Sequence, residues 1–285
     1  MLGTVGDPGL YSAPALSPDG TRLAFAAGDN AGNRDVWVRD LGGGGATRLT
    51  FDPRPDVTPV WSPDGKRIVY AASRGIRRDL YEKNADGSGE ERLVLQSDQD
   101  KAPTSWSHDG RFLLFQSIDP KTREDLWILP LEGDRKPFLF LGTNAREQFA
   151  QFSPDQRWIA YSAVSAANPE VFVRPFTPNS RSAASDAGPL WMVSSGGGLS
   201  PRWSADGKRL FYLFFNGDLM AVDIQARLSF QSGVPKRLFN IISQAGGAWA
   251  LSPSSDRFLF IRASATAGPP PPFTIVLNWM AKLEQ

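Results

Sequence analysis

The five residues WSPDG at positions 61–65 belong to a set of six related phrases, and their recurrence decides the fold. The other copies read LSPDG at 16–20, WSHDG at 106–110, FSPDQ at 152–156, WSADG at 203–207 and LSPSS at 251–255. The serines of successive copies are separated by 45, 45, 46, 51 and 48 residues. A nearly fixed period of this size indicates one supersecondary unit that is repeated along the chain.

Each repeat reads as four short strands joined by turns. Around the copy at 61–65, apolar and β-branched residues predict strands over 58–61, 67–73, 79–83 and 91–95. Proline, aspartate and glycine between the first two strands are typical of a tight hairpin, because glycine adopts positive φ without strain. Four antiparallel strands in about 45 residues are one blade of a β-propeller.

The residues that should form these hairpins recur in register. They are Ser17, Asp19, Gly20, Ser62, Asp64, Gly65, Ser107, Asp109, Gly110, Ser153, Asp155, Ser204, Asp206, Gly207 and Ser252. Gln156 and Ser255 stand where the other copies have glycine. A residue with a side chain in that left-handed conformation costs roughly 1 kcal/mol, which a large core tolerates.

Apolar residues follow the same register. An aromatic residue lies eight positions after each serine, at Phe25, Tyr70, Phe115, Tyr161, Tyr212 and Phe260. A second apolar residue precedes it by two, which places both on one face of the strand. A bulky residue directly precedes each serine, and we expect Trp61, Trp106 and Trp203 to be buried between blades.

The sequence therefore predicts an all-β fold, a six-bladed β-propeller with four antiparallel strands in each blade. A single domain over 1–285 should have blades that start near 13, 58, 103, 149, 200 and 248. The last copy supplies only three convincing strands, whereas "LGTV" at 2–5 has no blade of its own. We expect residues 2–5 to complete the last blade, because closure removes exposed sheet edges.

Composition excludes several classes of function. Lys plus Arg number 31 and Asp plus Glu 30, so no basic surface points to nucleic acid. Cysteine is absent, which excludes disulfides and thiol chemistry. No apolar run approaches the roughly 20 residues that span a bilayer, and no signal segment follows Met1. We expect either an intracellular protein or a piece of a longer one.

Several phrases carry a resemblance to known propellers. Repeated "SPDG" and "DGSG" turns resemble those of TolB-type six-bladed, WD-like propellers. "EVFVRPF" (170–176), the segment 191–213, "GDLMAVDI" (217–224), "GVPKRLF" (233–239) and "TIVLNW" (274–279) resemble the C-terminal propellers of bacterial, notably acidobacterial, transmembrane serine/threonine kinases. The departures are Gln156, Ser255 and a long insertion at 177–188.

The resemblance implies a non-catalytic binding, sensor or scaffold module. Its ligand would be a protein, a peptide or a glycan, its location periplasmic or otherwise extracytoplasmic, and its state monomeric. A cytoplasmic location is the alternative that the missing signal segment leaves open. The alternative function is a propeller enzyme, such as a lactonase or cyclase, or the propeller of a peptidase.

The search for reactive side chains favours the non-catalytic reading. His108, the only histidine, replaces the proline of a repeat turn and should lie in a surface hairpin. Asp29, Asn30, Asn33 and Asp35 offer oxygens for calcium, but their spacing is not that of an EF-hand, so a polar loop is expected. We expect no cofactor, no metal and no enzymatic activity.

Charged residues do gather where an innermost strand should begin. In a propeller, the loops that join one blade to the next lie at the same end as the loops between the second and third strands. We predict that this end binds the ligand and that Tyr11, Asp56, Asp100, Arg146 and Glu147 contribute exposed side chains there. Solvated charge is the alternative explanation for these residues.

Overall fold

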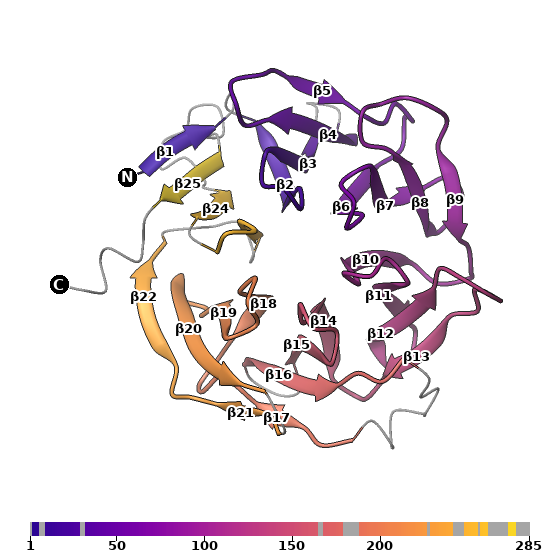
Figure 1. Cartoon of the computed structure of the whole chain (residues 1–285). Coiled ribbons are helices and arrows are strands. Elements are labelled where there is room, and N and C mark those ends of the chain that lie inside the picture. The colour runs from indigo at the N-terminus through magenta and orange to yellow at the C-terminus, as the bar shows by residue number, and fades with distance from the viewer. Residues whose placement is uncertain are drawn as a thin grey trace. The chain divides into compact units, whose positions relative to one another are not determined.

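The computed structural model describes residues 2–5, 9–28, 32–164, 168–178, 188–226, 229–241, 248–255, 257–261 and 273–277, with the backbone alone for 2–5 and 273–277. The chain divides into two compact units, and the division falls within β10 (Lys101–Trp106). Unit 1 comprises residues 1–103 and 242–285, and unit 2 comprises residues 104–241. All regular structure in the described residues is antiparallel β-sheet (Figure 1).

Unit 1 holds three four-stranded sheets, each with its strands in sequence order from one edge to the other except the last. They are β2 (Leu10–Leu16), β3 (Arg22–Gly28), β4 (Arg34–Asp40) and β5 (Ala46–Arg48); β6 (Asp56–Trp61), β7 (Arg67–Ser73), β8 (Arg78–Asn84) and β9 (Arg92–Leu95); and β23 (Trp249–Leu251), β24 (Arg257–Ile261), β25 (Phe273–Leu277) and β1 (Leu2–Val5).

Unit 2 holds the remaining sheets. They are β10 with β11 (Phe112–Asp119), β12 (Arg123–Pro130) and β13 (Phe138–Leu141); β14 (Arg146–Phe152), β15 (Trp158–Val164), β16 (Pro169–Pro175) and β17 (Trp191–Met192); and β18 (Leu199–Trp203), β19 (Arg209–Leu213), β20 (Asp218–Gln225), β21 (Gln231–Ser232) and β22 (Lys236–Asn240).

The prediction of six four-stranded blades is wrong. Within the described residues only five sheets are four-stranded, and the sheet that contains β18 has five strands. Its outer edge is split, because β21 and β22 both pair with β20. The break falls at Gly233-Val234-Pro235, where proline has no amide hydrogen to continue the ladder. The sequence "GVPKRLF" contains this break, which a fixed four-strand template overlooks.

The N-terminal strand does pair with the last repeat. β1 runs antiparallel to β25, with Leu2 opposite Val276 and Val5 opposite Phe273. Segments from the two ends of the chain therefore share one sheet, as expected from the unpaired strand sequence at residues 2–5.

The repeated phrase forms the same hairpin wherever it occurs. The Ser62 hydroxyl donates to Asp64 Oδ1 at 2.5 Å and accepts from the Arg67 amide at 2.9 Å. Asp64 Oδ1 also accepts from the Lys66 amide, so one serine and one aspartate satisfy the polar groups of the turn. The turn glycines have φ near +70°, and Gln156 and Ser255 adopt φ of 58° and 59° in their place.

The core is built from the register that the sequence shows. All six aromatic residues at the eighth position are buried. Trp61, Trp106 and Trp203 are 6%, 8% and 9% exposed, as predicted. In unit 1, Trp61 packs with Ala24 of the preceding sheet and its indole donates to the Ala15 carbonyl at 2.9 Å, so the tryptophan joins two sheets.

Candidate functional site

The connections that lead into the innermost strands carry the predicted ligand-binding residues. Tyr11, Asp56 and Asp100 belong to unit 1, and Arg146 and Glu147 to unit 2. Asp56 and Glu147 are 0% and 1% exposed, so the expectation of exposed loop charges is wrong for both. Asp56 is the first residue of β6 and Glu147 the second residue of β14, so both lie at the start of an antiparallel ladder.

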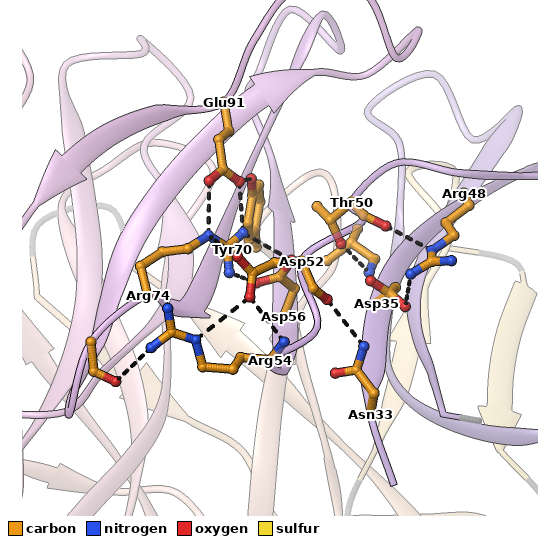
Figure 2. Close-up of polar contacts among 12 residues, drawn as sticks. Asn33, Asp35, Arg48, Thr50, Asp52, Arg54, Asp56, Tyr70, Arg74 and Glu91 are labelled. Carbon is orange, nitrogen blue, oxygen red and sulfur yellow. Dashed lines mark hydrogen bonds and ion pairs between the residues drawn. The ribbon is translucent and has the colours of Figure 1, made fainter. Parts of the chain in front are cut away.

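Asp56 is held by Arg74, which follows β7. Arg74 Nη1 lies 2.7 Å from Asp56 Oδ1 and Nη2 lies 3.0 Å from Oδ2. The other side of the same guanidinium meets Glu91, with Nε 2.8 Å from Oε1 and Nη2 2.6 Å from Oε2 (Figure 2). Tyr70 donates its hydroxyl to Glu91 at 2.9 Å, and Asp52 lies 3.5 Å from Arg74. One arginine thus neutralises the buried Asp56 carboxylate and joins it to two further acids, Asp52 and Glu91.

The pKa shifts follow from this arrangement. Burial raises the pKa of Asp56, and hydrogen bonds from Arg74 oppose that shift. Hydrogen bonding to Arg74 holds the pKa of Glu91 below its usual value. Burial and then the Glu91 carboxylate raise the pKa of Tyr70, so its hydroxyl stays protonated as a donor. Each shift thus follows from burial or from a charged partner within the network.

Asn33, just before β4, and Asp35, its second residue, make the neighbouring contacts in Figure 2. Asp35 Oδ2 pairs with Arg48 at 2.8 Å, and Asn33 donates its amide to the carbonyl of Asp52 at 3.1 Å. Asp29 and Asn30 lie outside the described residues. Of the four residues that the sequence offers for calcium, the two described ones therefore make an ion pair through Asp35 and a loop contact through the Asn33 amide nitrogen.

Asp100 occupies a half-buried position, and its neighbour Lys101 is the buried residue. Asp100 Oδ1 accepts a hydrogen bond from the Arg78 amide at 2.8 Å. Lys101 is 2% exposed and its ammonium lies 2.8 Å from Asp79 Oδ1. Sequence reasoning missed both Lys101 and Arg74. Lys101 could have been found from its position relative to the repeat serine, because Asp56, Lys101 and Glu147 each precede such a serine by six residues.

The two adjacent residues of β14 point to different surroundings. Arg146 is 44% exposed along its side chain and pairs with Glu124, with Nε 2.7 Å from Oε2. Glu147 is buried, and Thr143 donates its hydroxyl to Oε1. Burial and then the nearby Asp125 carboxylate raise the pKa of Glu147 to about 7. No ion pair among the described residues includes Glu147.

Tyr11 completes the predicted set and is half-buried. Its ring meets Phe25 edge to face, with centroids 5.2 Å apart. The structure therefore places Asp100 and Arg146 partly at the surface, Tyr11 against an aromatic neighbour, and Asp56 and Glu147 in the interior. His108 is exposed in its hairpin, as predicted.

Exposed apolar side chains mark the same end of the second sheet. Phe51 is 65% exposed in the connection before β6, and Ile76 is 98% exposed in the loop between β7 and β8. Arg54 Nη1 lies 3.3 Å from the Gly75 carbonyl, which joins these two loops. Arg48 and Lys83 approach the Phe51 ring at 4.9 and 5.7 Å from its centroid.

Neither a metal-binding cluster nor a membrane-spanning helix occurs in the described ranges. There, no group of three or more histidine, cysteine, aspartate or glutamate side chains is arranged to hold a metal ion. The same residues include no helix with the length and hydrophobicity that a membrane crossing requires.

Comparison with known proteins identifies the family. The family model PD40, TolB beta propeller domain, matches residues 4–172. The Tol-Pal system protein TolB of Anaeromyxobacter dehalogenans is 50% identical over 46 residues, which are 16% of this chain and 10% of that protein. The match thus spans about a tenth of the length of the curated relative.

Solved structures share the fold at low identity. A TolB-type protein from Agrobacterium tumefaciens superposes with a TM-score of 0.65 and 16% identity, covering 82% of each chain. Oligogalacturonate lyase from Vibrio parahaemolyticus superposes with a TM-score of 0.60 and 12% identity, covering 98% of this chain and 82% of that one. A TolB-type protein and a lyase thus share this architecture, so fold alone does not assign a function.

Proposed function

Because the chain belongs to the PD40 family of TolB β-propeller domains, we propose that it is a non-catalytic module that binds a protein or peptide partner. The proposal rests on one observation: Phe51 is exposed with Arg48 and Lys83 near its ring, and Ile76 is exposed in the loop that Arg54 joins to the Phe51 connection. Aromatic residues and arginines are the side chains that dominate binding energy at protein interfaces.

The charges around Phe51 favour a protein partner over a glycan or a purely anionic ligand. Asp52, which follows Phe51 in the chain, pairs with Arg54 at 3.6 Å, so charges of both signs belong to this connection. An apolar centre with a mixed-charge rim is the ordinary anatomy of a protein interface. Asp100 and Arg146, partly exposed at the ends of their own sheets, are further polar contributors to the proposed binding.

We also propose a sensor or scaffold role in the cell envelope. The likeness of the later repeats to the C-terminal propellers of bacterial membrane kinases supports this role, and so does the similarity to the Tol-Pal system protein TolB. In such an arrangement the chain contributes recognition, and any catalytic step belongs to another domain.

The test is affinity capture from the envelope fraction, followed by titration of the purified partner against purified variants. Phe51→Ala combined with Ile76→Ala should weaken binding by about 2 kcal/mol or more, the size of a hot-spot effect. Leu93→Ala is the matched control, because Leu93 is 45% exposed on the outer strand β9. The control should bind as the unaltered chain does.

Two results would overturn the proposal. Equal binding by the double variant and the control would show that Phe51 and Ile76 are not the contact surface. Turnover of a lactone, phosphoester or peptide substrate by the purified chain would show that the module is an enzyme.

A further inference from the structure

Three successive connections between sheets share one backbone design. They are the segments 50–56, 95–101 and 141–147. In each, a side-chain oxygen at the third position accepts from the amide two residues later: Asp52 from Arg54 (2.9 Å), Ser97 from Gln99 (3.4 Å) and Thr143 from Ala145 (3.0 Å). The seventh residue of each segment is the buried one, namely Asp56, Lys101 or Glu147.

The second segment holds a cation in a ring of oxygens. The Lys101 ammonium lies 2.8 Å from Asp79 Oδ1, 2.6 Å from the Gln99 carbonyl and 3.3 Å from the Ser97 carbonyl. One carboxylate and two main-chain carbonyls thus surround a buried positive charge. We call these three oxygens the cation cradle.

The third segment repeats the cradle in the same register. Leu80 pairs with Leu95 and Leu126 pairs with Leu141, each beside a bulge at the same point of the ladder. Asp125 therefore takes the position of Asp79, because each directly precedes the paired leucine. The carbonyls that correspond to Ser97 and Gln99 are those of Thr143 and Ala145.

In the segment 141–147, the equivalent of the cation cradle has no lysine and contains a further acidic residue instead. Glu147 stands where Lys101 stands, so two carboxyl groups replace an ion pair. Glu147 Oε2 and Asp125 Oδ1 are both buried, and neither has a hydrogen-bond partner in the structure. A buried carboxylate oxygen without a partner costs stability, and here two share one cradle.

Within the part of unit 2 that the structure describes, no cationic side chain pairs with Asp125 or Glu147. Arg74 offsets Asp56 from the position twelve residues after Ser62, and the residue at that offset in the Glu147 repeat is the neutral Ser165. Arg146, adjacent to Glu147, is engaged with Glu124. Asp119 and Glu124 add negative charge near Asp125. A ligand that completes the cradle must therefore be positive.

We propose that Asp125 and Glu147, with the Thr143 and Ala145 carbonyls, form a calcium site in unit 2. Calcium prefers carboxylate and main-chain carbonyl oxygens and tolerates irregular geometry. Two carboxylates match a divalent charge better than a monovalent one. Magnesium suits the site less, because it demands near-octahedral geometry and dehydrates reluctantly. The absence of nitrogen and sulfur donors from these four residues disfavours zinc and copper.

Calorimetric titration of the purified chain with CaCl2 tests the site directly. We expect one equivalent to bind with a Kd of about 10⁻⁴ to 10⁻³ M, the range of extracellular calcium modules. Calcium should raise the melting temperature, because it binds only the folded state. MgCl2 and KCl at equal ionic strength should do neither.

Three variants sharpen the test. Glu147→Gln keeps the shape of the side chain and removes its charge, and Glu147→Lys supplies the ammonium that the preceding cradle uses. Both should weaken calcium binding at least tenfold and abolish the calcium-dependent rise in melting temperature. Glu132→Gln, on a side chain that is 77% exposed in the loop between β12 and β13, is the matched control and should bind as the unaltered chain does.

The outcomes separate cleanly. No calcium binding up to 10 mM, about tenfold above the expected range, would overturn the site and leave the two carboxyls sharing a proton. Undiminished binding by both Glu147 variants would overturn it as well. If one Glu147 variant fails to fold, the other and Asp125→Asn carry the same prediction.

Discussion

Lys101 in unit 1 and Glu147 in unit 2 occupy the same backbone position of successive repeats, and their surroundings differ in one respect. Lys101 has the carboxylate of Asp79 at 2.8 Å, whereas Glu147 has the carboxyl of Asp125 nearby and no cation among the described residues. The backbone, the turn and the ladder register are alike. The comparison teaches that this fold specifies a buried polar position but leaves its charge to be balanced case by case.

Asp56 shows a third way to balance that position. Its partner is Arg74, which comes from the end of β7 and not from the preceding sheet. The position six residues before the repeat serine is therefore buried and charged in three repeats. The positive charge at that place comes from an arginine, from a lysine, or from the proposed calcium ion. Each of the three must supply a positive charge, because an unpaired buried carboxylate is strongly disfavoured.

The largest loss of stability should follow from placing in segment 95–101 the acidic residue that segment 141–147 has at the same position. Lys101→Glu places a carboxylate against Asp79 without a cation, so the free energy of unfolding should fall by about 3–5 kcal/mol. Urea denaturation measures the change. Lys136→Glu, the same charge reversal at an exposed hairpin residue, should change stability by less than about 0.5 kcal/mol. Equal losses in the two variants would break the comparison.

Removing Arg74, which balances the charge of Asp56, should lower the free energy of unfolding by slightly less. Arg74→Leu leaves Asp56 buried and Glu91 without its partner, and we expect a loss of roughly 3 kcal/mol in the free energy of unfolding. Part of the cost is relieved because Glu91 can reach solvent. Arg54→Leu is the control, since its side chain is 49% exposed, and its effect should stay within roughly 0.5 kcal/mol. Stability of the Arg74 variant equal to that of the control would show that Asp56 does not need a cation.

Placing a lysine at position 147 should change the free energy of unfolding by less, and in the opposite direction. In calcium-free buffer, Glu147→Lys should raise the free energy of unfolding by about 1–2 kcal/mol, because an ammonium hydrogen bond to Asp125 replaces two unpartnered carboxyl oxygens. Urea denaturation in EDTA measures it. A loss of stability would mean that the third cradle cannot hold an ammonium as the second does.

The smallest effect should be common to both units, because both contain the same hairpin. The Ser17 hydroxyl and the Thr21 amide lower the pKa of Asp19 to about 2, and the equivalent bonds lower the pKa of Asp64 and Asp206. A folded pKa below the unfolded value means that the stabilisation is complete above about pH 4 and is lost as pH falls toward 2.

Carboxyl chemical shifts followed from pH 5 to pH 1.5 test that window. Asp19→Asn should remove one such contribution, and the effect should be small because the carboxylate is largely solvent-exposed. An Asp19 midpoint at the ordinary aspartate value would contradict the prediction. The hairpin at Ser252 is an internal contrast, since Ser254 replaces the aspartate there and adds no titration.

Most of what could be predicted about the fold came from the repeated phrase. Serine, aspartate and the left-handed fourth residue specify the hairpin by local hydrogen bonds, so six spaced copies were enough to predict β-sheet repeats and the burial of Trp61, Trp106 and Trp203. The split outer edge of β21 and β22 was missed, because Pro235 acts through a single missing donor that strand patterns do not weigh.

The candidate site was predicted less well than the fold. Charge at the start of an innermost strand was visible at Asp56 and Glu147, but its burial was not, because burial depends on which connection covers the residue. Asp100 was chosen where Lys101 is the buried group, an error of one position along the strand. A one-residue shift sends a side chain to the opposite face of a strand, so local charge alone could not decide between them.

The sequence by itself determined the period, the hairpins and the apolar faces, because these depend on residues within a few positions of one another. Only the tertiary structure decided which charges are buried and what offsets them. Arg74 reaches Asp56 across 18 residues because β6 and β7 pair within one sheet. Lys101 reaches Asp79 across 22 residues because the connection between two successive sheets brings the start of β10 beside β8. The two carboxyls at Asp125 and Glu147 meet for the same reason, since packing fixes a backbone position before any side chain there finds a partner.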